Sequence, residues 1–119
     1  MQRWIRSALF AAFGLLFAVT AMGATLKCDI TSKFACSPSG CVNNNLGVWN
    51  LIDLDAKRFS RCGESGCDTY DMTSSQSGVY VNFEIPRTGM LAKMAADGGQ
   101  YVEVVTAGTG VLVSYGSCK

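Results

Sequence analysis

Six cysteines and a complete lack of histidine are the features of this sequence that bear most directly on chemistry. Four of the cysteines lie in two similar hexapeptides, CSPSGC at residues 36–41 and CGESGC at residues 62–67. The other two, Cys28 and Cys118, stand far apart in the chain. Cysteines in such patterns can form disulfides, bind zinc or act as a redox dithiol, and their spacing helps to separate these uses.

Zinc ligands are typically two to four residues apart, and histidine often contributes to the site. A redox dithiol favours the shorter CxxC spacing at the start of a helix, where the thiolate is stabilised. Neither hexapeptide has the CxxC spacing, and the chain has no histidine. We therefore expect structural disulfides, with no metal and no cofactor.

A four-residue gap can form a hairpin loop, whose flanking residues approach within the roughly 5.5 Å Cα separation that a disulfide needs. This predicts the pairs Cys36–Cys41 and Cys62–Cys67, with Gly40 and Gly66 supplying positive φ in the turns. The remaining pair, Cys28–Cys118, would close a loop of about 90 residues, which constrains the unfolded chain strongly.

Catalytic chemistry has little support in the residue types. Without histidine, the common serine and cysteine nucleophiles lack their usual base. A glycosidase would need two carboxylates in one cleft, and the nearest candidates are Asp53 with Asp55, Asp68 with Asp71, and Glu84 with Glu103. We interpret the first pair as the solvated ends of a turn, and we expect no catalytic residues and no enzyme activity.

The N-terminus predicts export. Arg3 and Arg6 precede an uncharged run over residues 7–24 that ends in small residues, which is typical of a secretory signal peptide. A membrane anchor is the alternative, because the run is near the lower limit of roughly 18 apolar residues for a span. Lys27 before the first cysteine argues against lipidation. We expect a periplasmic or secreted protein, free of the membrane after cleavage.

Residues 25–119 would then form one domain with a modest core. Of the ten basic residues two lie in the predicted leader, so eight basic residues stand against nine acidic ones. This balance lacks the basic field that nucleic acid binding requires. We expect a monomer with no nucleic acid partner.

Apolar and polar residues alternate with a period of two, as in half-buried strands. In residues 79–85 the alternation predicts that Val79, Val81, Phe83 and Ile85 share the inward face. Near the C-terminus, Val102 and Val104 on one strand and Val111, Val113 and Tyr115 on the next are predicted to face inward, with Val104 opposite Val113.

Turn residues separate these segments every 8 to 12 residues, which is typical of all-β domains. The predicted strands cover residues 27–31, 47–54, 57–62, 68–74, 79–85, 90–95, 100–106 and 110–117. We expect a small antiparallel meander closed into a roughly eight-stranded β-barrel, because closure removes the unpaired edges. A β-sandwich is the alternative.

Because we expect no metal site, no redox dithiol and no catalytic residues, binding is the remaining class of function. We expect a non-catalytic binding protein with a possible protein partner in the cell envelope. The first candidate surface is the serine-rich loop at residues 73–78 followed by Tyr80. A small apolar ligand carrier is an alternative, because an eight-stranded barrel can hold one small ligand.

The segment Ser75-Gln-Ser77-Gly-Val-Tyr80, the later Lys93 and the cysteines near both ends resemble the small periplasmic β-barrel inhibitors of C-type lysozyme. The similarity covers residues 73–118. It implies that Ser75 or Ser77, together with Lys93, enters the lysozyme cleft. Lysozyme inhibition through the 73–80 loop and Lys93 is therefore a second functional hypothesis.

Overall fold

The computed structural model describes residues 25–44 and 47–119, and the predicted leader lies outside them. These residues form an all-β structure, with no helix in the described part of the chain that could cross a membrane. The ten strands are β1 (Leu26–Ser37), β2 (Gly40–Asn43), β3 (Trp49–Asp53), β4 (Arg58–Gly63), β5 (Gly66–Asp71), β6 (Thr73–Ser77), β7 (Tyr80–Ile85), β8 (Met90–Ala95), β9 (Gly99–Ala107) and β10 (Gly110–Cys118).

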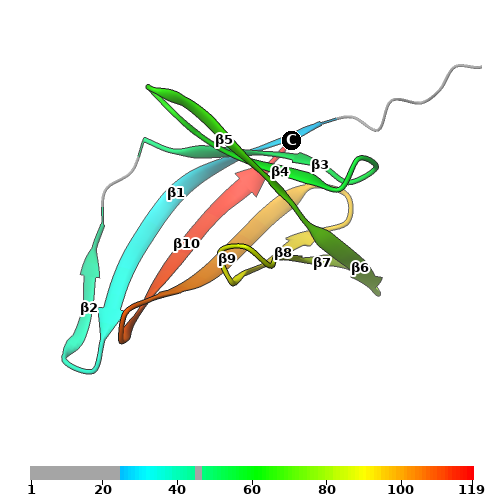
Figure 1. Cartoon of the computed structure of the whole chain (residues 1–119). Helices are drawn as coiled ribbons and strands as arrows, with labels where there is room; N and C mark the ends of the chain where they lie inside the picture. The colour runs from blue at the N-terminus through cyan, green and yellow to red at the C-terminus, as the bar shows by residue number, and fades with distance from the viewer. Residues whose placement is uncertain (1–24, 45–46) are drawn as a thin grey trace, which may run out of the picture.

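All ten strands belong to one antiparallel sheet that curls into a nearly closed barrel (Figure 1). The order is β5-β4-β3-β1-β10-β9-β8-β7-β6, with β2 paired to β1 beside this path. This is the predicted meander, in which the first strand lies beside the last. The sheet ends at β5 and β6, so the open seam lies there and not at the chain termini.

Only Met72 separates the two strands that flank the seam. Its amide donates to the Lys57 carbonyl at 3.0 Å, and the Lys57 ammonium donates to the Ser74 hydroxyl. The chain thus passes from one end of the sheet to the other at Met72, whose side chain is buried. The strands thus form a single curled sheet and not the two-sheet sandwich that was the alternative prediction.

The three disulfides pair as predicted. Cys28–Cys118 joins β1 to β10, and the other two bonds, Cys36–Cys41 and Cys62–Cys67, close the β1–β2 and β4–β5 hairpins. In each hairpin the cysteines stand directly opposite one another across a two-residue turn. Gly40 and Gly66 have φ values of 129° and 121°, so both turns use the glycine conformation that the sequence predicted.

The core lies inside the barrel. On β7 the side chains of Val81, Phe83 and Ile85 are buried, as the alternation predicted. Val79 is an exception to that prediction, because it lies in the turn before β7 and is exposed. The inward residues of β8 complete this wall: Met90, Ala92 and Met94.

The predicted faces of β9 and β10 are wrong. Val104 does pair with Val113, as expected, but Val104 and Tyr115 are exposed while Tyr101, Glu103 and Ser114 are buried. The inward face of β9 and β10 therefore carries polar side chains, among them Glu103 and Ser114. The buried side chains of Tyr101 and Glu103 satisfy one another within a hydrogen-bonded cluster described below, which removes much of the cost of burying them.

A β-bulge shapes the pairing of β1 with β10. The register shifts between Ile30 and Ser32, so the intervening Thr31 is left unpaired. Such an extra residue reverses which side chains face inward along the strand. Gly116 of β10 pairs with Ile30, next to this bulge, and a Cβ added to Gly116 would lie 2.0 Å from the Asp29 carbonyl oxygen. The close approach of β1 and β10 therefore requires glycine here.

Candidate functional site

The structure brings all four predicted binding residues onto the outer wall of the barrel. Ser75 and Ser77 lie on β6, Tyr80 on β7 and Lys93 on β8. Ser77 pairs with Tyr80, while Ser75 and Lys93 both pair with Asn82 from opposite sides. Paired residues on neighbouring strands point to the same face of a sheet, so these side chains share one surface.

The predicted serine-rich loop is in fact a strand. Thr73–Ser77 forms β6 and pairs residue by residue with β7, and the turn between them is confined to Gly78 and Val79. Ser75 and Ser77 therefore stand on a hydrogen-bonded strand and not on a flexible tip. The ammonium of Lys93 lies 5.5 Å from the ring centroid of Tyr80, within the range of a cation–π contact.

An apolar surface continues from these residues across the next strands. We call it the outer patch, and it comprises Tyr80, Leu91, Lys93, Val102, Val104, Val113 and Tyr115. The register aligns Val113, Val104 and Leu91 in one row across β10, β9 and β8. A second row aligns Tyr115, Val102 and Lys93. The patch is thus a continuous part of the sheet.

A groove of about 610 Å³ crosses this surface. Tyr80, Lys93, Tyr115 and Val102 of the outer patch line it, together with Thr31 at the bulge and Gln100. The two tyrosine rings can contact apolar parts of a partner. The Lys93 ammonium, the Thr31 hydroxyl and the Gln100 amide can form hydrogen bonds with its polar parts.

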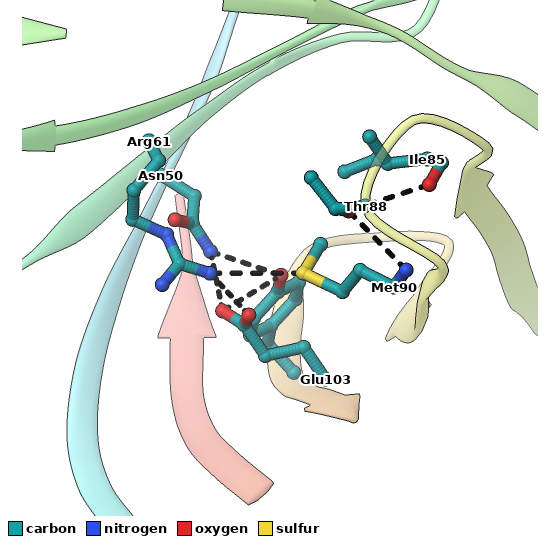
Figure 2. Close-up of polar contacts among 7 residues, drawn as sticks. Asn50, Arg61, Ile85, Thr88, Met90 and Glu103 are labelled. Atoms are coloured by element: carbon teal, nitrogen blue, oxygen red, sulfur yellow. Dashed lines mark hydrogen bonds and ion pairs between the residues drawn. The ribbon is translucent and has the colours of Figure 1, made fainter. Parts of the chain in front are cut away.

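A separate polar cluster lies inside the barrel (Figure 2). Asn50 of β3 donates through Nδ2 to Tyr101 Oη at 2.9 Å and to Glu103 Oε1 at 2.8 Å. Arg61 of β4 donates through Nη2 to Glu103 Oε2, and Tyr101 Oη donates to Glu103 Oε1 at 3.3 Å. The Glu103 carboxylate therefore accepts three donors and is charge-paired, although its side chain is only 2% exposed.

Two polar atoms of this cluster are buried without a hydrogen-bond partner, Asn50 Oδ1 and Arg61 Nε. Leaving a buried donor or acceptor unpaired costs about 1–3 kcal/mol. No role was predicted from the sequence for Asn50, Arg61 or Tyr101. A prediction of which residues pair between β3 and β4 would have identified Asn50 and Arg61, because these two polar residues lie directly opposite one another.

Burial raises the pKa of the Tyr101 hydroxyl well above its usual value, and the nearby negative charge of Glu103 raises that pKa further. The phenol therefore stays protonated and donates its hydrogen bond. Because the pKa is higher in the folded than in the unfolded chain, this contribution to stability is complete below about pH 10 and is lost as the pH rises towards the folded value.

We accordingly expect the free energy of unfolding to fall steeply above about pH 10 in the wild type and less steeply in Tyr101→Phe. Urea denaturation at pH 8 and at pH 11 measures the difference. Tyr115→Phe, which changes an exposed tyrosine, is the control and should keep the wild-type slope. Equal slopes for wild type and Tyr101→Phe would contradict this account of the pKa.

The acidic pairs considered from the sequence do not form carboxylate pairs in a cleft. Glu84 is exposed and pairs with the outward Leu91, whereas Glu103 is buried inside the barrel, so the wall separates the two carboxylates. Asp53 Oδ1 accepts the Ala56 amide at 2.9 Å, which fits its interpretation as a turn residue. Asp71 forms an exposed ion pair with Arg58 at 3.2 Å.

Within residues 25–44 and 47–119, no three acidic or cysteine side chains are grouped where they could hold a metal ion. All six cysteines are in disulfides. Comparison with known proteins found no matching family model, no matching curated protein and no matching solved structure.

Proposed function

We propose that this protein is an exported, non-catalytic binding protein that holds a protein partner on its outer patch. One observation carries the proposal. Among the described residues six large hydrophobic side chains are exposed, and four of them lie on the consecutive strands β7 to β10: Tyr80 (43%), Leu91 (58%), Val104 (38%) and Tyr115 (48%). Contiguous exposed apolar surface of this kind, bordered by polar residues, marks interaction sites.

Export is part of the proposal because the three disulfides are typical of oxidising compartments. Together with the predicted signal peptide at residues 1–24, they favour the periplasm or the cell exterior. A rigid sheet also suits binding. The backbone of the paired strands is already fixed by hydrogen bonds, so little backbone conformational entropy is lost when a partner docks.

The binding role can be tested by capture with immobilised protein in an extract of the cell envelope. We expect the wild type and Val42→Glu to retain the same partner, since Val42 is exposed but lies on β2 away from the outer patch. Leu91→Glu should lose that partner, because a carboxylate would be buried in the interface. Retention of the partner by Leu91→Glu would contradict the proposal.

Inhibition of C-type lysozyme is a second candidate, and the arrangement of Ser75, Tyr80 and Lys93 favours it. Ser75 and Lys93 flank Asn82 in one row, and Lys93 lies beside the ring of Tyr80. Lysozymes cleave glycosidic bonds with a pair of carboxyl groups. An ammonium on a rigid wall is complementary to such an acidic cleft.

We therefore expect the purified protein to slow the lysis of cell walls by C-type lysozyme, and Lys93→Ala to weaken inhibition by at least about 30-fold, consistent with loss of a buried charge pair of 2 kcal/mol or more. Arg87→Ala removes an exposed cation from the turn between β7 and β8 and should inhibit like the wild type. An absence of inhibition at micromolar wild-type protein would remove this candidate but not the broader binding role.

A further inference from the structure

A second apolar surface lies on the inner face of the sheet, at the far end of its longest strands. The register aligns one row of residues across β2, β1, β10 and β9, namely Val42, Ala35, Leu112 and Val105. Leu112 precedes the buried Ser114 by two residues, so Leu112 and the residues paired with it face inward. We call this row the inner strip.

The inner strip is less covered towards β2. Val105 still packs against the core, Ala35 and Leu112 are partly buried, and the side chain of Val42 is 67% exposed. An open groove of about 460 Å³ lies here, and Ala35, Val42 and Leu112 contribute to its lining. Figure 1 shows the tips of the β1–β2 and β9–β10 hairpins together at this end of the sheet. The outer patch does not include this apolar surface, because the two lie on opposite faces.

A lysine borders the inner strip on the side of the core. Lys33 pairs with Ser114 in the next inward row, and its side chain is partly buried. None of the ion pairs among the described residues includes Lys33. The carboxylate in the same row, that of Glu103, is already paired with Arg61. The inner face thus carries an ammonium without a counter-charge beside an apolar strip.

The shape and charge of the inner strip limit the kind of ligand. The strip is one residue wide, because the row beyond it consists of small residues near the hairpin tips: Ser37, Gly40, Ala107 and Gly110. Neighbouring strands lie about 4.8 Å apart, so the strip is about 14 Å long. A narrow apolar strip of this length fits one extended hydrocarbon chain, and Lys33 is complementary to an anionic head group.

From these observations we infer that the inner strip binds a single-chain amphiphile with a carboxylate head group, as in a free fatty acid. Its hydrocarbon chain would lie across the strip, and its carboxylate would accept a hydrogen bond from the Lys33 ammonium. A second chain would find no apolar row beside the first. This site does not depend on protein binding at the outer patch, which lies on the other face of the sheet.

Titration of isotope-labelled protein by NMR tests the inference with three probes below their micelle-forming concentrations: decanoate, hexanoate and decyltrimethylammonium. We expect saturable binding of decanoate, with shifted signals at Ala35, Val42 and Leu112. Hexanoate has a shorter chain and should bind at least about tenfold more weakly. Decyltrimethylammonium has the opposite charge and should also bind at least about tenfold more weakly. Absence of saturable decanoate binding at millimolar concentration, or equal binding of decanoate and decyltrimethylammonium, would overturn the inference.

A matched pair of variants separates this site from the outer patch. Val42→Glu puts a negative charge on the inner strip and should weaken decanoate binding at least about tenfold. Leu91→Glu makes the same kind of change on the outer patch and should bind decanoate like the wild type. Both side chains are exposed, so neither change removes core packing. Retention of decanoate by Val42→Glu, or its loss from Leu91→Glu, would overturn the assignment.

Lys33→Met tests the head-group contact, because it keeps an apolar stem and removes the charge. We expect decanoate to bind about tenfold more weakly to this variant and decyltrimethylammonium to bind no more weakly than to the wild type. Unchanged decanoate affinity would overturn the role of Lys33.

Two further measurements test other occupants of the inner strip. We expect the wild type not to sediment with phosphatidylglycerol vesicles and to be a monomer in analytical ultracentrifugation. Vesicle binding or dimer formation that Val42→Glu abolishes would show that a bilayer or a second copy covers the strip, and would overturn the inference.

Discussion

Replacing both Cys28 and Cys118 by alanine is expected to lower the free energy of unfolding by about 4 to 5 kcal/mol. The bond spans 90 residues of sequence, and in the chain-entropy model the stabilisation grows with the length of the closed loop. Both cysteines are also buried against the core. The bond therefore fixes β1 beside β10, where the first and last strands of the barrel meet.

Urea denaturation without reductant measures this effect. The double variant Cys36→Ala/Cys41→Ala is the control, because its bond spans only 5 residues and should contribute about 2 kcal/mol in the same model. Equal losses from the long and the short bond would contradict the role assigned to Cys28–Cys118.

The second large effect is expected for Glu103→Gln, which should lower the free energy of unfolding by about 3 kcal/mol. A neutral amide keeps the size of the side chain but leaves the Arg61 guanidinium without its counter-charge. Removing one partner of a buried ion pair typically costs about 3–5 kcal/mol. The side chain of Arg61 is 26% exposed, so water screens part of its charge, which places the effect at the lower end of this range.

Glu84→Gln is the matched control, because Glu84 is exposed on the outer face of β7 and its change should stay within about 0.5 kcal/mol. A double variant separates charge from packing. If Arg61→Met/Glu103→Met recovers much of the lost stability, the unpaired charge was the cause. A loss in Glu103→Gln no larger than in Glu84→Gln would contradict the importance of the cluster.

The sequence predicted those parts of the fold that depend on local spacing. The short gaps within the hexapeptides predicted two hairpin disulfides, and the remaining cysteines then had to pair. The alternation over Val81, Phe83 and Ile85 predicted a buried face, which the structure confirms. In the two hairpins and in β7, a pattern within about six consecutive residues determines the outcome, and the third disulfide follows by elimination.

Two strands, β2 and β6, and the second half of β1 escaped prediction, because neither strand has a buried apolar face and a bulge interrupts β1. β6 has the sequence TSSQS, which is typical of a turn, yet its backbone pairs along the whole strand with β7. The second half of β1 follows the bulge at Thr31, which reverses the alternation, so that Phe34 packs on the outer face with Tyr115. Hydrogen bonding to a neighbouring strand, and not side-chain pattern, creates these elements.

The candidate site was predicted only in part for a related reason. Ser75, Ser77, Tyr80 and Lys93 were chosen from the sequence, but the valines of β9 were assigned to the core. Lys93 pairs with Val102, so an outward lysine requires an outward valine beside it. Which of two possible faces is buried depends on this register between strands, and the register is not contained in either strand alone.

We propose that the outer patch binds a protein partner, and site-specific photo-crosslinking can detect that contact. A photoreactive residue would be placed at Leu91 in the patch and, as a control, at Val42 on β2, which is also exposed. We predict an adduct with one envelope protein from position 91, none from position 42, and a weaker adduct at position 91 when Lys93→Ala is added. Equal adducts from both positions, or an adduct only with a second copy of this chain, would contradict the claim.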